Sequence, residues 1–223
     1  MRIHLQREIE KLKRQILTLS AEVEEDVRAA VRSVEERDPV LAQATIDREI
    51  GTDAQEVDVE EECLKILALH QPVAADLRYI IAVLKINQDL ERIGDLAVHI
   101  AKRALFLGEQ PAEAAPFRLG AMADRAQQML KNVLEAFVNL DVAAARAVCA
   151  ADNEFDKMNR EVYQQVKVAI LKNPEALEPL IQIMHIARHL ERIADHATNI
   201  AEDLIYLVEG QIVRHQPVKG VEI

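Results

Sequence analysis

Two segments of this chain carry the same pair of acidic residues at the same spacing. Residues 89–103 read DLERIGDLAVHIAKR, and residues 189–203 read HLERIADHATNIAED. The acidic pairs are Glu91 with Asp95 and Glu191 with Asp195. Residues four apart lie on one face of a helix, where two like charges destabilise the helix by about 0.2–0.5 kcal/mol. The spacing therefore indicates either a solvated acidic face or a site that binds cations.

A third acidic pair adds to the evidence for a cation site. Asp152 and Asp156 are again four apart, on a helix that should run antiparallel beside the one carrying Glu191. Four carboxylates from two neighbouring helices suit cations such as magnesium, manganese, calcium, iron or zinc. In the first half, Asp47 takes the place of Asp152, but Gly51 replaces the second acid. We therefore expect a weaker site in the first half.

Histidine residues near the second acidic pair raise the question of a zinc site. His185 and His189 are four apart and His196 follows two turns later, which is a spacing that zinc can use on a helix. The glutamate of an HExxH motif is absent. Helical geometry also places the histidines about 100° away from Glu191 and Asp195. We expect these histidines to be surface residues.

Other catalytic patterns are missing from the sequence. A carboxylate-bridged di-iron centre needs repeated Glu-x-x-His motifs that project into the bundle, and no glutamate here is followed by histidine at that spacing. There is no GxxxxGK[ST] phosphate-binding loop, and the chain has only two serines, Ser20 and Ser33. We predict no catalytic residues. An enzyme that uses a bound metal as a Lewis acid is the least favoured alternative.

Apolar residues around each acidic pair predict the helices that position it. In each segment aliphatic residues recur every three or four positions and form a stripe about 140° from the acids. The stripes are Ile86, Leu90, Ile93, Ala97, Ile100 and Ala104, and Ile186, Leu190, Ile193, Ala197, Ile200 and Leu204. Aromatic residues are only 3% of the chain, and no sustained period-two alternation predicts strands. The sequence predicts an all-α fold with the acids near its outer surface.

Helix-breaking residues divide the chain into six long antiparallel helices in two groups of three. We predict a first three-helix bundle over residues 1–108, a linker over 109–116, a second bundle over 117–210 and a polar tail over 211–223. The repeated segments end the two halves. This position indicates two tandem bundles related by pseudo-twofold symmetry.

Charge and composition exclude several classes of function. The formal net charge is −11, and no basic, aromatic-interleaved patch supports nucleic-acid binding. The charged N-terminus and the lack of a long apolar run predict neither a signal peptide nor membrane insertion. Cys63 and Cys149 have no metal-binding spacing, which is typical of buried free thiols in a reducing compartment. We expect a soluble, cytoplasmic protein.

Along essentially its whole length the chain resembles the PhoU family of phosphate-transport accessory proteins. The resemblance is carried by HLQREIEKLKRQILTL (4–19), HQPVAADLRYIIAVLKINQDLERIGDLAVHIA (70–101) and HLERIADHATNIAEDLIYLVEG (189–210). It implies two three-helix bundles with E(D)xxxD motifs that hold metal ions or clusters on their surfaces. Transferred to this sequence, the motif residues are Glu91, Asp95, Glu191, Asp195, Asp152, Asp156 and Asp47, with Gly51 breaking the last motif.

The resemblance also implies a regulatory function. A PhoU-like protein would contact the ATPase subunit of the phosphate ABC transporter and a phosphate-sensing histidine kinase, and would restrain phosphate uptake and starvation signalling. It would form a homodimer and carry divalent or transition metal ions such as iron, zinc or magnesium. The alternative is a metal-free adaptor whose acidic faces bind a basic partner, with the steep salt dependence that exposed charges confer.

Overall fold

The structure is a computed structural model that describes residues 2–110 and 119–211, and every element within these ranges is helical. The first half contains α1 (Arg2–Glu35), α2 (Pro39–Asp47), α3 (Glu49–His70) and α4 (Ala74–Gly108). The second half contains α5 (Gly120–Asn139), α6 (Val142–Lys172), the short 3-10 helix η2 (Pro174–Ala176) and α7 (Leu177–Glu209). The predicted all-α class is confirmed.

Capping residues explain several of the helix boundaries. Asp38 precedes α2, and its carboxylate accepts hydrogen bonds from the backbone amides two and three residues later, at 2.9 and 3.0 Å. Asp141 caps α6 in the same way, accepting from the amide of Ala144 at 3.0 Å. These bonds satisfy amides that have no partner inside the helix. At the end of α7, Gly210 takes a left-handed φ of 70°, which glycine adopts without a steric penalty.

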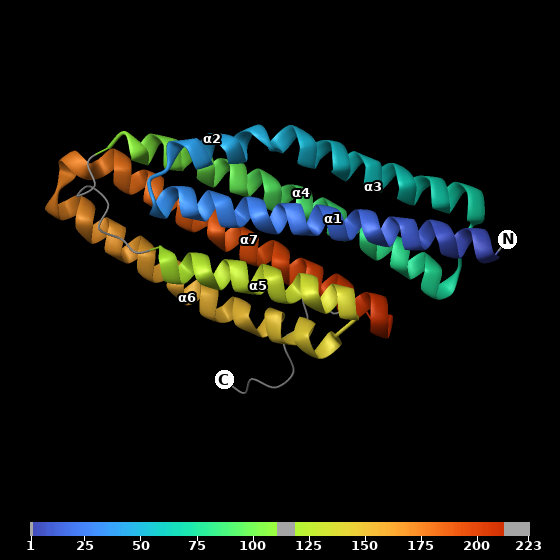
Figure 1. Cartoon of the computed structure of the whole chain (residues 1–223). Coiled ribbons are helices and arrows are strands. Elements are labelled where there is room, and N and C mark those ends of the chain that lie inside the picture. The colour runs from blue at the N-terminus through green and yellow to red at the C-terminus, as the bar shows by residue number, and fades with distance from the viewer. Residues whose placement is uncertain (1, 111–118, 212–223) are drawn as a thin grey trace, which may run out of the picture.

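The helices form two bundles that pack against each other through their last helices. α1 to α4 pack together in the first bundle, and α5 to α7 pack together in the second. α4 lies along α7 in the middle of the elongated molecule, with α2 and α3 on one side and α5 and α6 on the other (Figure 1). The two copies of the repeated segment therefore lie at the interface between the bundles.

Polar contacts show that α4 and α7 run antiparallel. Near the start of α4, Lys85 Nζ lies 3.1 Å from Asp203 Oδ1, close to the end of α7. Near the end of α4, Arg103 Nη1 donates to Gln182 Oε1 at 3.0 Å, close to the start of α7. Two equivalent helices that pack antiparallel are what a pseudo-twofold axis between the halves requires.

The two predicted apolar stripes are buried. Each of their twelve residues is between 0% and 3% exposed, and they belong to one continuous hydrophobic core that spans both bundles. Burying an Ile or Leu side chain stabilises a fold by about 1.5–3 kcal/mol. Core packing therefore accounts for the repeated apolar positions. It does not account for the repeated acids.

The second long helix differs from its expected form. It is interrupted at Arg48, which separates α2 from α3, and Arg48 Nε donates to Asp26 Oδ1 on α1 at 2.6 Å. Most of the predicted linker over 109–116 and nearly all of the predicted tail over 211–223 lie outside the described residues. Their boundaries stay predictions.

The cysteines are unreactive side chains in this fold. Cys63 is buried, Cys149 is half-buried, and neither is in a disulfide. Burial raises the pKa of Cys63 to about 12 and that of Cys149 to about 11. Both thiols are therefore protonated at neutral pH, and the thiolate is the reactive form.

Among the helices described, none is long and apolar enough to cross a bilayer.

Candidate metal-binding clefts

The first acidic cleft lies between α3 and α4. Five carboxylates line it: Glu49 and Asp53 from α3, Glu91 and Asp95 from α4, and Asp26 from α1. The cleft encloses about 10 Å³, which is the space of roughly one water molecule. It has room for an ion and not for an organic substrate.

Asp47, which the sequence analysis placed in this site, does not line the cleft. It is the exposed last residue of α2, and its carboxylate accepts a hydrogen bond from Gln43 Nε2 at 2.7 Å. Glu49 and Asp53 face Glu91 and Asp95 instead. The expected register was therefore wrong by two residues. Gly51 removes no acid from this cleft, so the weaker first-half site that it predicted has no structural basis.

Burial and repulsion disfavour the charged form of Glu91 in the first cleft. The pKa of Glu91 is raised by its burial and then by the charge of Asp95, while Arg92 acts in the opposite direction. Arg92 lies 3.2 Å from a carboxylate oxygen of Glu91 and 3.8 Å from one of Asp95. The pKa of Glu56, one turn beyond Asp53, is also raised by burial and by neighbouring acids. Arg92, together with Arg48 on Asp26, thus offsets only part of the negative charge.

Asp152 and Asp156 on α6 lie near Glu191 and Asp195 on α7, and we call these four acids the second acidic cleft because they correspond to the first. The pKa of Asp195 is raised mainly because the surrounding protein desolvates its carboxylate. The charges of Asp152, Glu191 and Asp156 raise this pKa further, and the charge of Arg188 lowers it. The pKa of Asp152 is likewise raised by burial and then by Asp156. The four acids that the sequence analysis assigned to this half are therefore near enough for their charges to affect one another.

Arginines also neutralise part of the second cleft. Arg188 forms an ion pair with Glu191 one turn away, and Arg160 Nη1 lies 4.0 Å from Asp156 Oδ2. The Glu191 side chain is 14% exposed, compared with 28% for Glu91. Glu91 and Glu191 are therefore partly buried, whereas Asp53 and Asp195 are exposed, so each group of acids lies at the surface where two helices meet.

The donor set fits a hard or borderline cation, because each cleft offers carboxylate oxygens from two adjacent helices. In residues 2–110 and 119–211, however, no three His, Cys, Asp or Glu side chains converge closely enough to hold one ion. Binding would therefore require the carboxylates to rotate toward a common point and away from their arginine partners. Glu and Asp side chains at helix surfaces have several staggered rotamers that permit this movement.

Two of the three histidines predicted to lie on the surface belong to the interface between the bundles. His189 on α7 stacks on His99 of α4, with ring centroids 5.4 Å apart, and its two ring nitrogens are buried without a hydrogen-bond partner among the described residues. His196 Nδ1 lies 2.8 Å from Asp89 Oδ1 on α4. Only His185 is exposed as expected. His189 and His196 are covered because α4 packs on α7 at these positions.

Protonation of His189 is expected to destabilise the protein in acid. Burial, and to a smaller extent the charges of neighbouring basic groups, lowers the pKa of His189 to about 4. The unfolded chain binds this proton near pH 6.5, so stability falls as the pH drops from about 6.5 toward 4. Urea unfolding at pH 7 and pH 5 should show a smaller acid-induced loss for His189→Phe than for the wild type. Equal losses would contradict the assignment.

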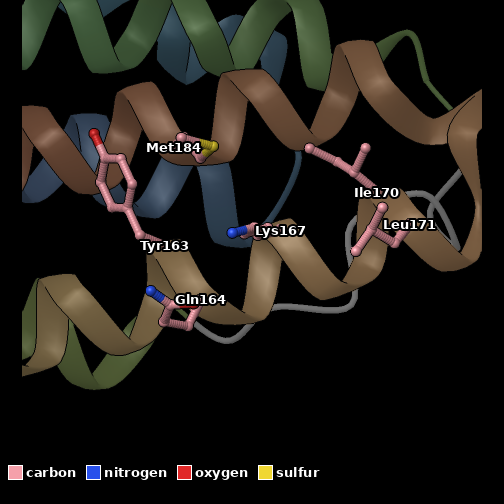
Figure 2. A pocket seen from close by; sticks show the side chains of 6 residues that line it. All are labelled: Tyr163, Gln164, Lys167, Ile170, Leu171 and Met184. Atoms are coloured by element: carbon pink, nitrogen blue, oxygen red, sulfur yellow. The ribbon is translucent and has the colours of Figure 1, made fainter.

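A separate cavity of about 340 Å³ opens near the far end of the second bundle (Figure 2). Its lining residues are Tyr163, Gln164, Lys167, Ile170 and Leu171 from α6 and Met184 from α7. None of these six is a Ser, Cys, His, Asp or Glu, so the cavity offers no cluster of metal ligands and no Ser or Cys nucleophile. It is distinct from the two acidic clefts.

Comparisons with known proteins agree over most of the chain. A family model described as the PhoU domain matches residues 5–104 and 119–204. The phosphate-specific transport system accessory protein PhoU homolog of Pseudomonas putida is 36% identical over 215 residues, which cover 95% of this chain and 83% of that protein. The homolog from Aquifex aeolicus is 35% identical over 213 residues, which cover 96% of each.

Solved structures share the fold. The crystal structure of PhoU from Pseudomonas aeruginosa superimposes with a TM-score of 0.88 at 35% sequence identity, covering 92% of this chain and 99% of that one. The phosphate transport system regulatory protein PhoU from Streptococcus pneumoniae gives a TM-score of 0.84 at 28% identity, covering 94% and 99%. The arrangement of two bundles is therefore common to these proteins.

Proposed function

This chain belongs to the PhoU family of phosphate transport accessory and regulatory proteins, and from that premise we propose that it restrains phosphate uptake and starvation signalling. The observation that carries the proposal is the match along almost the whole chain, in both sequence and fold. The names of these relatives describe accessory and regulatory proteins and not enzymes. Regulation therefore proceeds through binding.

The partners that we propose are the ATPase subunit of the phosphate ABC transporter and the phosphate-sensing histidine kinase, both met in the cytoplasm. A rigid helical scaffold supports this role, because preformed surfaces bind with little loss of conformational entropy. The net charge of −11 favours basic contact surfaces on such partners. We include a homodimer in the same proposal, on the family resemblance alone.

Metal ions at the two acidic clefts are the second component of the proposal. Glu49, Asp53, Glu91 and Asp95 would hold a divalent or transition metal ion in the first half. Asp152, Asp156, Glu191 and Asp195 would do so in the second. A bound cation would supply the positive charge that the mutually repelling carboxylates lack, and would cross-link two helices in each bundle. The raised pKa values support this reading.

A metal-free adaptor is the second candidate, and the arginine pairs favour it. Arg92 and Arg188 already contact acids in the two clefts, and no three metal ligands converge in the described part of the chain. In that case the clefts would receive basic side chains from a partner. Partner binding would then weaken steeply with salt and be indifferent to chelators.

Phosphate uptake in a bacterial strain that lacks its own PhoU tests both components. Expression of the wild type should lower radiolabelled phosphate uptake several-fold in phosphate-rich medium. Asp152→Asn/Asp195→Asn should fail to do so if metal binding is required. The matched control is Asp124→Asn/Glu135→Gln, which removes two exposed acids from α5 and should behave as the wild type. No effect of the wild type would overturn the regulatory role. Full activity of the cleft variant would overturn a role for the second cleft in regulation, either as a metal site or as a site for a basic partner. Chelator sensitivity of partner binding distinguishes these two roles.

A further inference from the structure

The outer face of α3 carries an apolar stripe that nothing in the described structure covers. Ile50 is 79% exposed, Val57 48% and Leu64 53%. They are seven residues apart, so they drift by only about 20° per step and stay on one face of the helix. Exposed alanines at positions 54 and 68 extend this face. The opposite face of α3 packs inward, with Thr52, Val59 and Ile66 buried. We call Ile50, Ala54, Val57, Glu61, Leu64 and Ala68 the α3 stripe.

The equivalent face of α6 shows that the stripe is not a general feature of this fold. The acid pair Glu49/Asp53 corresponds to Asp152/Asp156, and this correspondence aligns α3 with α6. The positions that match the α3 stripe are Asn153, Lys157, Arg160, Gln164, Lys167 and Leu171. All six are exposed, and five of them are polar or charged. The fold therefore accepts a solvated outer helix, and the apolar residues on α3 require another explanation.

Acidic residues surround the α3 stripe. α3 contains seven acidic residues against one lysine, and helical geometry places Asp53 and Glu60 on one side of the stripe and Asp58 on the other. Glu61 is itself a member of the stripe. Such a surface repels an anionic membrane and repels a second α3 placed against it. The equivalent α6 face of a second copy has the right charge, but only one of its six residues, Leu171, is apolar.

We propose that the α3 stripe binds an amphipathic helix of a partner protein, with apolar residues at heptad spacing and Lys or Arg on their flanks. The apolar residues of that helix would pack on Ile50, Val57 and Leu64, as knobs at a and d positions do in a coiled coil. Its basic flanks would pair with Glu60 and Glu61. This inference goes beyond the proposed function and does not depend on metal binding, because the stripe lies outside the acidic clefts.

Two fluorescent three-heptad peptides test the proposal by anisotropy with the full chain. One has Leu at the a and d positions with Lys on the flanks, and the other has Glu in place of each Lys. Both are used at concentrations where the peptide is monomeric. The Lys peptide should bind at least tenfold more tightly than the Glu peptide. Val57→Gln/Leu64→Gln, which preserves charge, should weaken its binding at least tenfold, equivalent to about 1.4 kcal/mol.

The matched control is Val168→Gln/Leu171→Gln, which removes an exposed Val and an exposed Leu from α6. This variant should bind the Lys peptide within twofold of the wild type. Circular dichroism verifies that both variants remain helical. Equal loss in the two variants, no loss in the α3 variant, or equal binding of both peptides would overturn the proposal. So would sedimentation showing that the wild type is a dimer and the α3 variant a monomer, since a second copy would then occupy the stripe.

Discussion

Replacing Ile193 with alanine is expected to lower the free energy of unfolding by about 3 kcal/mol. Ile193 lies on α7 at the interface with α4 and is 0% exposed. Truncating it removes buried methyl groups and leaves a cavity that a closely packed helical core refills only in part. Urea unfolding followed by circular dichroism at pH 7 measures the change.

Ile93 provides a matched second test, because it holds the same place in the first copy of the repeated segment and is also 0% exposed. Ile93→Ala should cost a similar amount if both copies pack in the same way. Arg192→Ala changes the exposed neighbour of Ile193 and should alter stability by less than about 0.5 kcal/mol. A loss below 1 kcal/mol for both isoleucine variants would show that the repeated stripe is not the core of the interface between the bundles.

Zn²⁺ or Mn²⁺ is expected to stabilise the chelator-treated wild type by about 2.7 kcal/mol when free metal reaches a hundred times its dissociation constant. The physical reason is the mutual repulsion within each acidic cleft, which a cation relieves. Asp152→Asn/Asp195→Asn should lose the part of this stabilisation that comes from the second cleft. Thermal unfolding with added metal, together with elemental analysis of protein purified without chelating resin, provides the measurement.

Without metal, the same double substitution should raise the free energy of unfolding or leave it unchanged. The pKa values of Asp152 and Asp195 are raised in the folded protein, mainly by burial. The folded state therefore binds protons more tightly than the unfolded chain, and the contribution of these acids to stability falls as the pH rises above their ordinary pKa near 3.8. In chelator at pH 7, Asp152→Asn/Asp195→Asn should be at least as stable as the wild type.

The wild type and the double variant differ in unfolding free energy, and the pH dependence of this difference reports on the two carboxyls alone. Other titrating groups such as His189 are present in both proteins and cancel. The stability advantage of the variant should shrink as the pH is lowered from 7 to 4, where the wild-type carboxyls become protonated. Stabilisation by metal should be larger at pH 7 than at pH 5, because metal competes with protons for the same oxygens. A variant that is destabilised in chelator and unresponsive to pH would show that these acids support the fold directly.

The α3 stripe and the first acidic cleft share α3 but lie on different faces of that helix. Glu49 and Asp53 turn toward α4, whereas Ile50 and Val57 are exposed on the outer face. A helix bound to the stripe would therefore lie beside the first cleft without entering it. Metal occupancy and partner binding can be measured separately, and a change in one caused by the other would be a coupling between adjacent sites.

Local patterns in the sequence determined the helices, the buried stripes and the spacing of the acids. These properties follow from the geometry of one helix, in which residues three and four apart share a face. The twelve stripe residues are buried as predicted. The acid pairs in the second half could be identified because both helices carry them at an unambiguous spacing of four.

Only the tertiary structure decided which acids face one another in the first half and what surrounds the histidines. Alignment of the two halves favoured Asp47, although Glu49 and Asp53 have the same spacing of four and a search for that spacing would have found them. The register between two packed helices is set by side chains that interlock across their interface, often distant in sequence. The stacking of His189 on His99 depends on α4 and α7 packing antiparallel, which no local pattern encodes.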